Sequence, residues 1–132
     1  MRVTPTERLF LLAGWLAVAG CGGEACIDEL ACGPTETPSF DTLYAEVLAP
    51  SCAIASRSCH GPGGARTPSM VDAETARAEL EAYVVPGRPL CSEVVVRVTS
   101  TEAGERMPPA AASRLASEDV CRLAAWIDAL PE

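Results

Sequence analysis

The sequence contains no lysine, asparagine or glutamine, and aromatic residues make up only 5% of its 132 residues. All ten basic residues are therefore arginine, and 18 acidic side chains give a formal net charge of −8. Because nucleic acids and anionic lipids bind basic surfaces, this charge argues against either as the main partner. Hydrophobic residues nevertheless make up 48% of the chain, which is enough to build a packed core. We therefore expect one ordinary domain.

The N-terminal residues resemble a bacterial lipoprotein signal. Two arginines flank the polar start of an apolar run, residues 9–19, which is shorter than the roughly 20 residues of a membrane-spanning helix. The run ends in Leu-Ala-Val-Ala-Gly before Cys21, which resembles the lipobox, whose cysteine is lipidated and becomes the mature N-terminus. Residues 1–20 would then be the signal peptide, with an ordinary cleaved signal as the alternative. Gly22 in place of Asp favours the outer membrane.

Seven cysteines are many for a chain of this length and indicate an oxidising compartment such as the cell envelope. Six of them remain once Cys21 carries lipid, and six cysteines allow many pairings. Residues 21–37 are rich in glycine, proline, threonine and acidic residues, so we expect a flexible tether there. A local Cys26–Cys32 disulfide is the simplest interpretation within the tether. We expect a second disulfide, Cys91–Cys121, to fasten the middle of the domain to its last helix.

Apolar residues at helical spacing predict three amphipathic helices within the domain, residues 38–132. Their expected ranges are 40–48, 72–83 and 117–130, with Ser39, Asp72 and Ser117 as N-caps. Pro50 should end the first helix, because proline has no backbone N–H. The segments between the helices are rich in glycine and proline and predict loops. Residues 94–98, Val-Val-Val-Arg-Val, favour a strand on composition alone.

His60 is the only histidine of the chain, and it directly follows Cys59. In c-type cytochromes such a pair attaches haem through the cysteine sulfur and holds the histidine under the iron. Met107 lies far along the chain before two prolines, which would stiffen a loop that presents its sulfur as second ligand. Met70 is the competing sulfur. The alternative for the pair is a disulfide cysteine beside a surface histidine.

Residues 40–130 resemble a small class I cytochrome c domain, of the kind found in envelope proteins of planctomycetes and myxobacteria. The features that carry the resemblance follow in order: an opening helix, Cys52…Cys59-His60-Gly61, Val84-Val85-Pro86-Gly87-Arg88-Pro89-Leu90-Cys91-Ser92, Met107-Pro108, and a closing helix with Trp126-Ile127. The resemblance implies an all-α fold, a bundle of about four short helices with extended loops. It also implies that residues 92–98 form a short helix, against their composition.

The resemblance further implies a mono-haem, one-electron carrier. One haem c would be bound covalently through Cys52 and Cys59, with His60 and Met107 as axial ligands of the iron. Arg88 or Arg97 could pair with the haem propionates. No enzyme is expected, since a lone histidine gives no basis for a Ser-His-acid set and Cys-x6-Cys is not the redox Cys-x2-Cys motif.

The spacing of the haem cysteines departs from the family pattern, which has two residues between them. Here six residues separate Cys52 from Cys59. In a continuous helix they would lie about 10 Å apart, which is too far for a disulfide and poor for attachment to one haem edge. The segment must therefore loop out under either chemistry. The alternative function is a haem-free lipoprotein domain, with Cys52 bonded to Cys59 and the cytochrome-like shell serving as an interaction module.

Charge and compartment together predict the partners. An acidic surface favours a redox protein with a basic patch, and the encounter rate should depend on salt. We expect contact with the membrane through the lipid anchor only, and no contact with nucleic acid. The predicted location is the cell envelope, most simply the outer membrane on its periplasmic or surface face. A structural zinc site built from Cys52, Cys59, His60 and a further cysteine is a weaker alternative.

Overall fold

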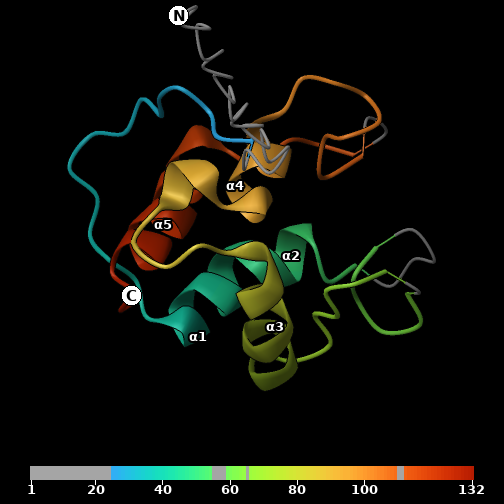
Figure 1. Cartoon of the computed structure of the whole chain (residues 1–132). Coiled ribbons are helices and arrows are strands. Elements are labelled where there is room, and N and C mark those ends of the chain that lie inside the picture. Colours follow the sequence, from blue (N-terminus) through green and yellow to red (C-terminus); the bar gives the residue numbers. More distant parts are fainter. Residues whose placement is uncertain (1–24, 55–58, 65, 110–111) are drawn as a thin grey trace, which may run out of the picture.

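The computed structural model describes residues 25–54, 59–64, 66–109 and 112–132, so the predicted signal peptide and Cys21 lie outside the described residues. Figure 1 shows helices joined by long loops, and the described residues contain no strand, which confirms the all-α prediction. The elements in order are α1 (Phe40–Leu43), η1 (Tyr44–Leu48), α2 (Ala49–Ser51), α3 (Ala73–Leu80), η2 (Glu81–Tyr83), η3 (Pro89–Cys91), α4 (Glu93–Thr99) and α5 (Ser117–Asp128). None of the described helices has the length and apolar character needed to span a membrane.

The first predicted helix comprises α1, η1 and α2, which follow one another without a break. The Ser39 hydroxyl accepts a hydrogen bond from the backbone N–H of Thr42 at 3.1 Å, which confirms the predicted N-cap. The helix ends at Ser51, one residue beyond Pro50, so the prediction that Pro50 ends it is wrong by one residue. Pro50 lies at the first positions of α2, which begins after the π-helical turn η1, and proline is tolerated in the first turn of a helix.

The second helix begins at its predicted cap. An Asp72 carboxylate oxygen accepts from the backbone N–H of Thr75 at 2.8 Å, and hydrogen bonds from Thr75 hold the pKa of Asp72 below its ordinary value. Helix α3 continues into η2, which ends at Tyr83 as predicted. Residues 73–83 are therefore helical over the predicted range.

Residues 93–99 form helix α4, as the resemblance implied and against their β-branched composition. Packing explains the outcome, because Val95 and Val98 are buried in the core. The hydroxyl of Ser92, at the start of α4, is fully buried. It accepts from the backbone N–H of Val85 at 2.9 Å and donates to the carbonyl of Arg88 at 3.1 Å. These bonds fix the turn that precedes α4.

Helix α5 is the longest and lies against both α1 and α4 (Figure 1). The predicted cap is one residue off, since Ser117 is the first helical residue and Ala116 takes the cap position without a side-chain bond. The rings of Phe40 and Trp126 lie 5.0 Å apart between centroids where α1 and α5 meet. This tilted pair joins the two ends of the domain in one core.

The two predicted disulfides are wrong in their pairing. The structure joins Cys26 to Cys91, and Cys32 to Cys121, in place of the local pairs Cys26–Cys32 and Cys91–Cys121. The segment that carries Cys26 and Cys32 has an apolar side that its composition concealed, because Ile27 and Leu30 pack against the core. We call residues 26–32 the strap.

The strap follows the α4–α5 side of the molecule before the chain enters α1 (Figure 1). The backbone N–H of Ile27 donates to the carbonyl of Leu90 at 2.9 Å, which positions Cys26 beside Cys91. The segment that was predicted to be a free tether is thus fastened to the domain at two points within residues 26–32.

Candidate functional site

A cavity of about 510 Å³ brings together all four residues that were predicted to hold haem. Cys52, Cys59, His60 and Met107 line it, although Met107 lies more than forty residues from the other three in sequence. Its volume lies within the range of small-molecule and cofactor sites. Apolar side chains from four helical elements form its inner wall: Leu48, Leu80, Val98 and Leu123. The cavity therefore combines apolar walls with sulfur and imidazole groups.

A backbone hydrogen bond joins the two ends of the Cys52–His60 segment despite its length. The backbone N–H of His60 donates to the carbonyl of Cys52 at 3.1 Å. In a two-residue spacing, the histidine would lie four residues after the first cysteine, and an α-helical turn would make the same bond. The bond between Cys52 and His60 is thus kept at the longer spacing. Residues 55–58, most of the spacer that was predicted to loop out, lie outside the described residues.

Gly61 permits the backbone at residue 61 to approach the backbone at residue 53 closely. A Cβ atom at position 61 would clash with the carbonyl oxygen of Ala53. Glycine is therefore required at this position for the backbones to come so close. This close approach explains why a glycine follows Cys59-His60 in this chain.

Cys52 and Cys59 are both free thiols, each partly buried at the cavity. Burial raises the pKa of Cys52 to about 11, and the neighbouring Cys59 adds to the rise. The pair is thus available for covalent attachment, and Cys52 is held as a neutral thiol at neutral pH.

His60 is held in one tautomer. Its Nδ1 lies 2.7 Å from the carbonyl oxygen of Pro68, and because a carbonyl oxygen can only accept, Nδ1 must carry the hydrogen. The other ring nitrogen, Nε2, is then unprotonated in the neutral ring and able to bind a metal. Metal-ligating histidines almost always donate their second ring N–H in this way. Sequence reasoning missed Pro68, since no spacing rule connects it to His60.

The two candidate methionines differ in their surroundings. Met107 is half-buried, and its backbone N–H donates to the carbonyl of Arg97 at 3.0 Å, which places it on the α4 side of the cavity. Met70 is only 3% exposed, belongs to the core, and donates its backbone N–H to the carbonyl of His60 at 2.7 Å. Both methionines line the cavity, but Met70 is bonded through its backbone to His60, whereas Met107 reaches the cavity from the loop after α4. The arrangement favours Met107 as the partner of His60.

Two arginines border the cavity. Arg97 lines it and forms an ion pair with Glu93 at 2.7 Å on the same helix. Arg66, which sequence reasoning did not single out, lines it as an exposed side chain. Arg88, the other arginine considered for carboxylates, instead donates to the sulfur of Cys91. Arg66 and Arg97 are thus the basic groups placed to meet a ligand carboxylate at this site.

Within the described ranges, no group of three or more His, Cys, Asp and Glu side chains is arranged to hold a metal ion. The cavity is lined by one histidine, two thiols and the thioether sulfurs of Met70 and Met107. Soft sulfur and imidazole together are a donor set typical of haem proteins.

Residues 57–111 match the family model described as Planctomycete cytochrome C. The matched range includes Cys59, His60 and Met107 and begins after Cys52. This match supports the resemblance that the motifs carried, a cytochrome c-like domain of planctomycete type. Searches of curated proteins and of solved structures gave no significant match.

Proposed function

We propose that the protein is a mono-haem c-type cytochrome that carries single electrons at the cell envelope. One observation carries the proposal: Cys52, Cys59, His60 and Met107 line one cavity, and His60 is fixed in the tautomer that leaves Nε2 available. The cytochrome c-like family match over residues 57–111 is consistent with it. Haem, when bound, would supply the one-electron chemistry, and the chain supplies attachment, ligation and exclusion of water.

Each residue has a distinct role in this proposal. Cys52 and Cys59 would form the two thioether bonds, and the hydrogen bond from His60 N–H to the Cys52 carbonyl keeps both sulfurs beside the cavity despite the long spacer. His60 would bind the iron through Nε2, with Pro68 holding the ring. Met107 would hold the iron through its thioether sulfur. A thioether together with imidazole as iron ligands raises the reduction potential, which suits an electron carrier.

The surrounding side chains fit the same group. The apolar wall formed by Leu48, Leu80, Val98 and Leu123 would exclude water and lower the local dielectric. Arg66 and Arg97 would meet the propionates, with Glu93 orienting the Arg97 guanidinium. A bound carboxylate would compete with Glu93 for Arg97.

We further propose that Cys21 carries the lipid and anchors the protein at the envelope, in keeping with the lipobox-like sequence before it. Membrane contact would occur only through this anchor. The acidic charge of the chain would select a redox partner with a basic patch and make the encounter faster at low salt.

The proposal is tested by expressing the protein with a c-type maturation system and recording the pyridine haemochrome spectrum after denaturation. The wild type should retain haem with two thioether bonds, and Cys52→Ser and Cys59→Ser should each retain haem with one. The Cys26→Ser/Cys91→Ser variant is the matched control and should keep both thioethers. Loss of all haem from the wild type, with Cys52 disulfide-bonded to Cys59, would instead support the haem-free interaction module.

A further inference from the structure

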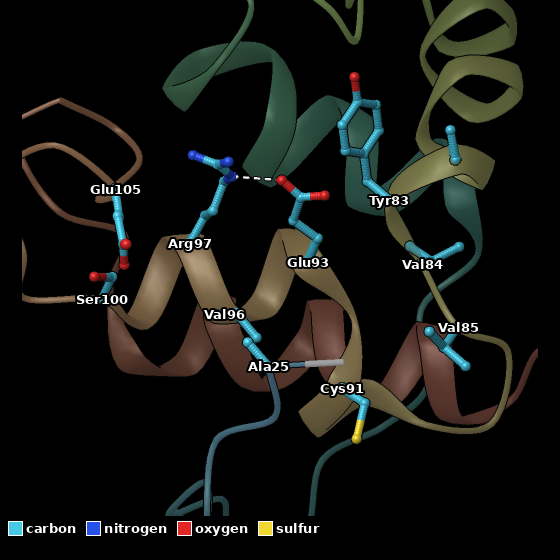
Figure 2. Close-up of a pocket in the computed structure, with 11 residues that line it drawn as sticks. Ala25, Tyr83, Val84, Val85, Cys91, Glu93, Val96, Arg97, Ser100 and Glu105 are labelled. Atoms are coloured by element: carbon cyan, nitrogen blue, oxygen red, sulfur yellow. Dashed lines mark hydrogen bonds and ion pairs between the residues drawn. The ribbon is translucent and has the colours of Figure 1, made fainter. Parts of the chain in front are cut away.

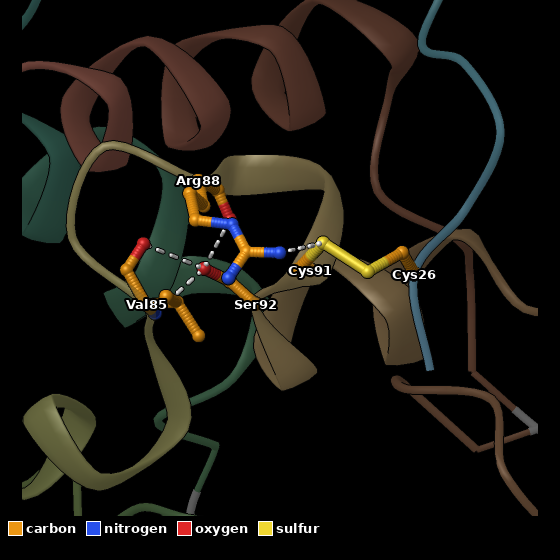
Figure 3. The surroundings of a disulfide bond; sticks show 5 residues. All are labelled: Cys26, Val85, Arg88, Cys91 and Ser92. Carbon is orange, nitrogen blue, oxygen red and sulfur yellow. Dashed lines mark hydrogen bonds between the residues drawn. A yellow bond between two sulfur atoms is a disulfide. The ribbon is translucent and has the colours of Figure 1, made fainter. Parts of the chain in front are cut away.

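The two disulfides of the domain have different electrostatic surroundings. Arg88 donates from Nη2 to the sulfur of Cys91 at 3.3 Å (Figure 3). At the other disulfide, the Cys121 sulfur lies 3.9 Å from the carbonyl oxygen of Ala31. The adjacent Arg122 is bound to Glu46 and lies 3.8 Å from Asp119. A guanidinium thus contacts the sulfur of Cys91, whereas the sulfur of Cys121 lies against a carbonyl oxygen.

The position of Arg88 is set by the fold. Gly87 has a φ of 68°, which glycine adopts readily, and the backbone N–H of Arg88 donates to the carbonyl of Val85 at 2.9 Å. The carbonyl of Arg88 accepts from the buried Ser92 hydroxyl at 3.1 Å. Hydrogen bonds thus hold both the N–H and the carbonyl of Arg88, and they fix the backbone from which its guanidinium reaches the disulfide.

We propose that the Cys26–Cys91 disulfide is a site of thiol–disulfide exchange, attacked at Cys26 with Cys91 as the leaving thiolate. Exchange is faster when the leaving sulfur is stabilised as a thiolate, and a guanidinium in contact with Cys91 provides that stabilisation. Figure 3 shows the Arg88 guanidinium on the Cys91 side of the bond, with Cys26 on the far side. The cation therefore favours one direction of cleavage.

The exposure of the two cysteines agrees with attack at Cys26. Cys26 is exposed, whereas Cys91 is half-buried. Cys91 also borders a second cavity of about 400 Å³, which Ala25 borders from the strap side (Figure 2). An incoming thiolate can thus reach Cys26 from solvent, and release of Cys26 would free the Ala25 wall of this cavity.

The co-reactant is a dithiol oxidoreductase of the Cys-x2-Cys class. Its thiolate would form a bond with the Cys26 sulfur while the Cys26–Cys91 bond breaks, and the electron pair would leave on Cys91 beside Arg88. Its second thiolate would then attack the mixed disulfide and release Cys26. The oxidoreductase ends as a disulfide, and Cys26 and Cys91 end as two thiols, so two electrons are transferred.

Reduction would leave Cys32–Cys121 as the one disulfide that fastens the strap to the rest of the domain, beside the Ile27–Leu90 hydrogen bond and the packing of Ile27 and Leu30. If Cys21 carries lipid as proposed above, the chain between the anchor and the first covalent attachment to the rest of the domain would lengthen from five residues to eleven. The exchange site would thereby set how far the domain can move from the membrane. The exchange chemistry itself does not depend on the anchor or on haem.

Reduced glutathione is the probe for the test, applied to the oxidised, folded protein, with trapped thiols and mixed disulfides located by tandem mass spectrometry. Cys26–Cys91 should open before Cys32–Cys121, and the mixed disulfide should form on Cys26. Arg88→Gln should slow opening roughly three- to tenfold, as expected from the loss of one positive charge beside the leaving sulfur. Arg88→Lys should recover part of the rate.

Arg77→Gln is the matched control, because Arg77 is an exposed arginine on α3 that borders neither the disulfides nor the haem cavity. It should open at the wild-type rate. The proposal is overturned if the mixed disulfide forms on Cys91, if Cys32–Cys121 opens first, or if Arg88→Gln opens as fast as the wild type. The wild-type regiochemistry decides the question even where a variant folds poorly.

Discussion

Replacing either disulfide by a pair of serines should lower the free energy of unfolding by about 4 kcal/mol, and the two variants should be destabilised equally. The disulfides span 65 and 89 residues, so separation alone would assign them different effects. Both, however, close the same ring. While one is intact, the other closes a ring made only of residues 26–32 and 91–121, which is 38 residues.

In the chain-entropy model, closing a ring of 38 residues stabilises the folded state by about 3.9 kcal/mol at 25 °C. The measurement compares Cys26→Ser/Cys91→Ser and Cys32→Ser/Cys121→Ser in urea unfolding of the haem-free protein, followed by circular dichroism. Haem-free protein is used because a covalent cofactor would add its own contribution to stability.

A third variant, Cys26→Ser/Cys32→Ser, distinguishes the pairings. With the disulfides of the structure, it loses both and leaves Cys91 and Cys121 as free thiols, at a total cost of roughly 8 kcal/mol. With local pairing it would lose only a seven-residue loop, worth about 2.4 kcal/mol. The reasoning is refuted if the third variant is more stable than the other two, or if those two differ by more than about 1.5 kcal/mol.

Three further predictions concern the cavity. In the haem-free protein, burial and the neighbouring Cys59 raise the pKa of Cys52 to about 11, so iodoacetamide at pH 8 should modify Cys52 at least about tenfold more slowly than in the unfolded chain. The rate should climb as the pH approaches that pKa, and equal rates at pH 8 would contradict the burial. Met107→Ala should abolish the methionine-to-iron charge-transfer band of the oxidised haem protein, whereas Met70→Ala should keep it and cost about 2–5 kcal/mol of stability; the reverse pattern would make Met70 the ligand. Gly61→Ala should sharply reduce the yield of covalent haem, because its Cβ would meet the Ala53 carbonyl, while Gly104→Ala, with open space around it, should match the wild type.

The helices could be predicted where apolar spacing and caps agree. Ser39 and Asp72 cap their helices as expected, because both the cap and its bonding partner lie within one turn of sequence. Helix α4 could not be predicted from composition, since burial of Val95 and Val98 outweighs the strand preference of a valine run. Only the family resemblance anticipated it.

The disulfide pairing could not be predicted from neighbours in the sequence. Cys26 lies near Cys32 in sequence but beside Cys91 in space, because Ile27 donates a hydrogen bond to Leu90 and the partly buried Ile27 and Leu30 pack against the core. Two apolar residues in a segment rich in glycine and acid gave too weak a signal to predict this packing.

The candidate site was predictable as a set of residues but not as a geometry. The motifs named Cys52, Cys59, His60 and Met107, and the structure places all four on one cavity. No motif specifies the backbone positions on which two features of the site depend. One is the hydrogen bond from His60 to Cys52, which joins the two residues despite the six-residue spacer, and the other is the Pro68 carbonyl that holds the imidazole.

Arg57 lies within the spacer, so trypsin cleaves the chain between Cys52 and Cys59 and allows a direct test of haem attachment. The purified holoprotein is fully reduced, alkylated, cleaved and analysed by mass spectrometry. The account predicts that the Cys52 and Cys59 peptides remain joined after reduction, with the added mass of one haem. It is contradicted if the two peptides separate on reduction, both alkylated and free of haem.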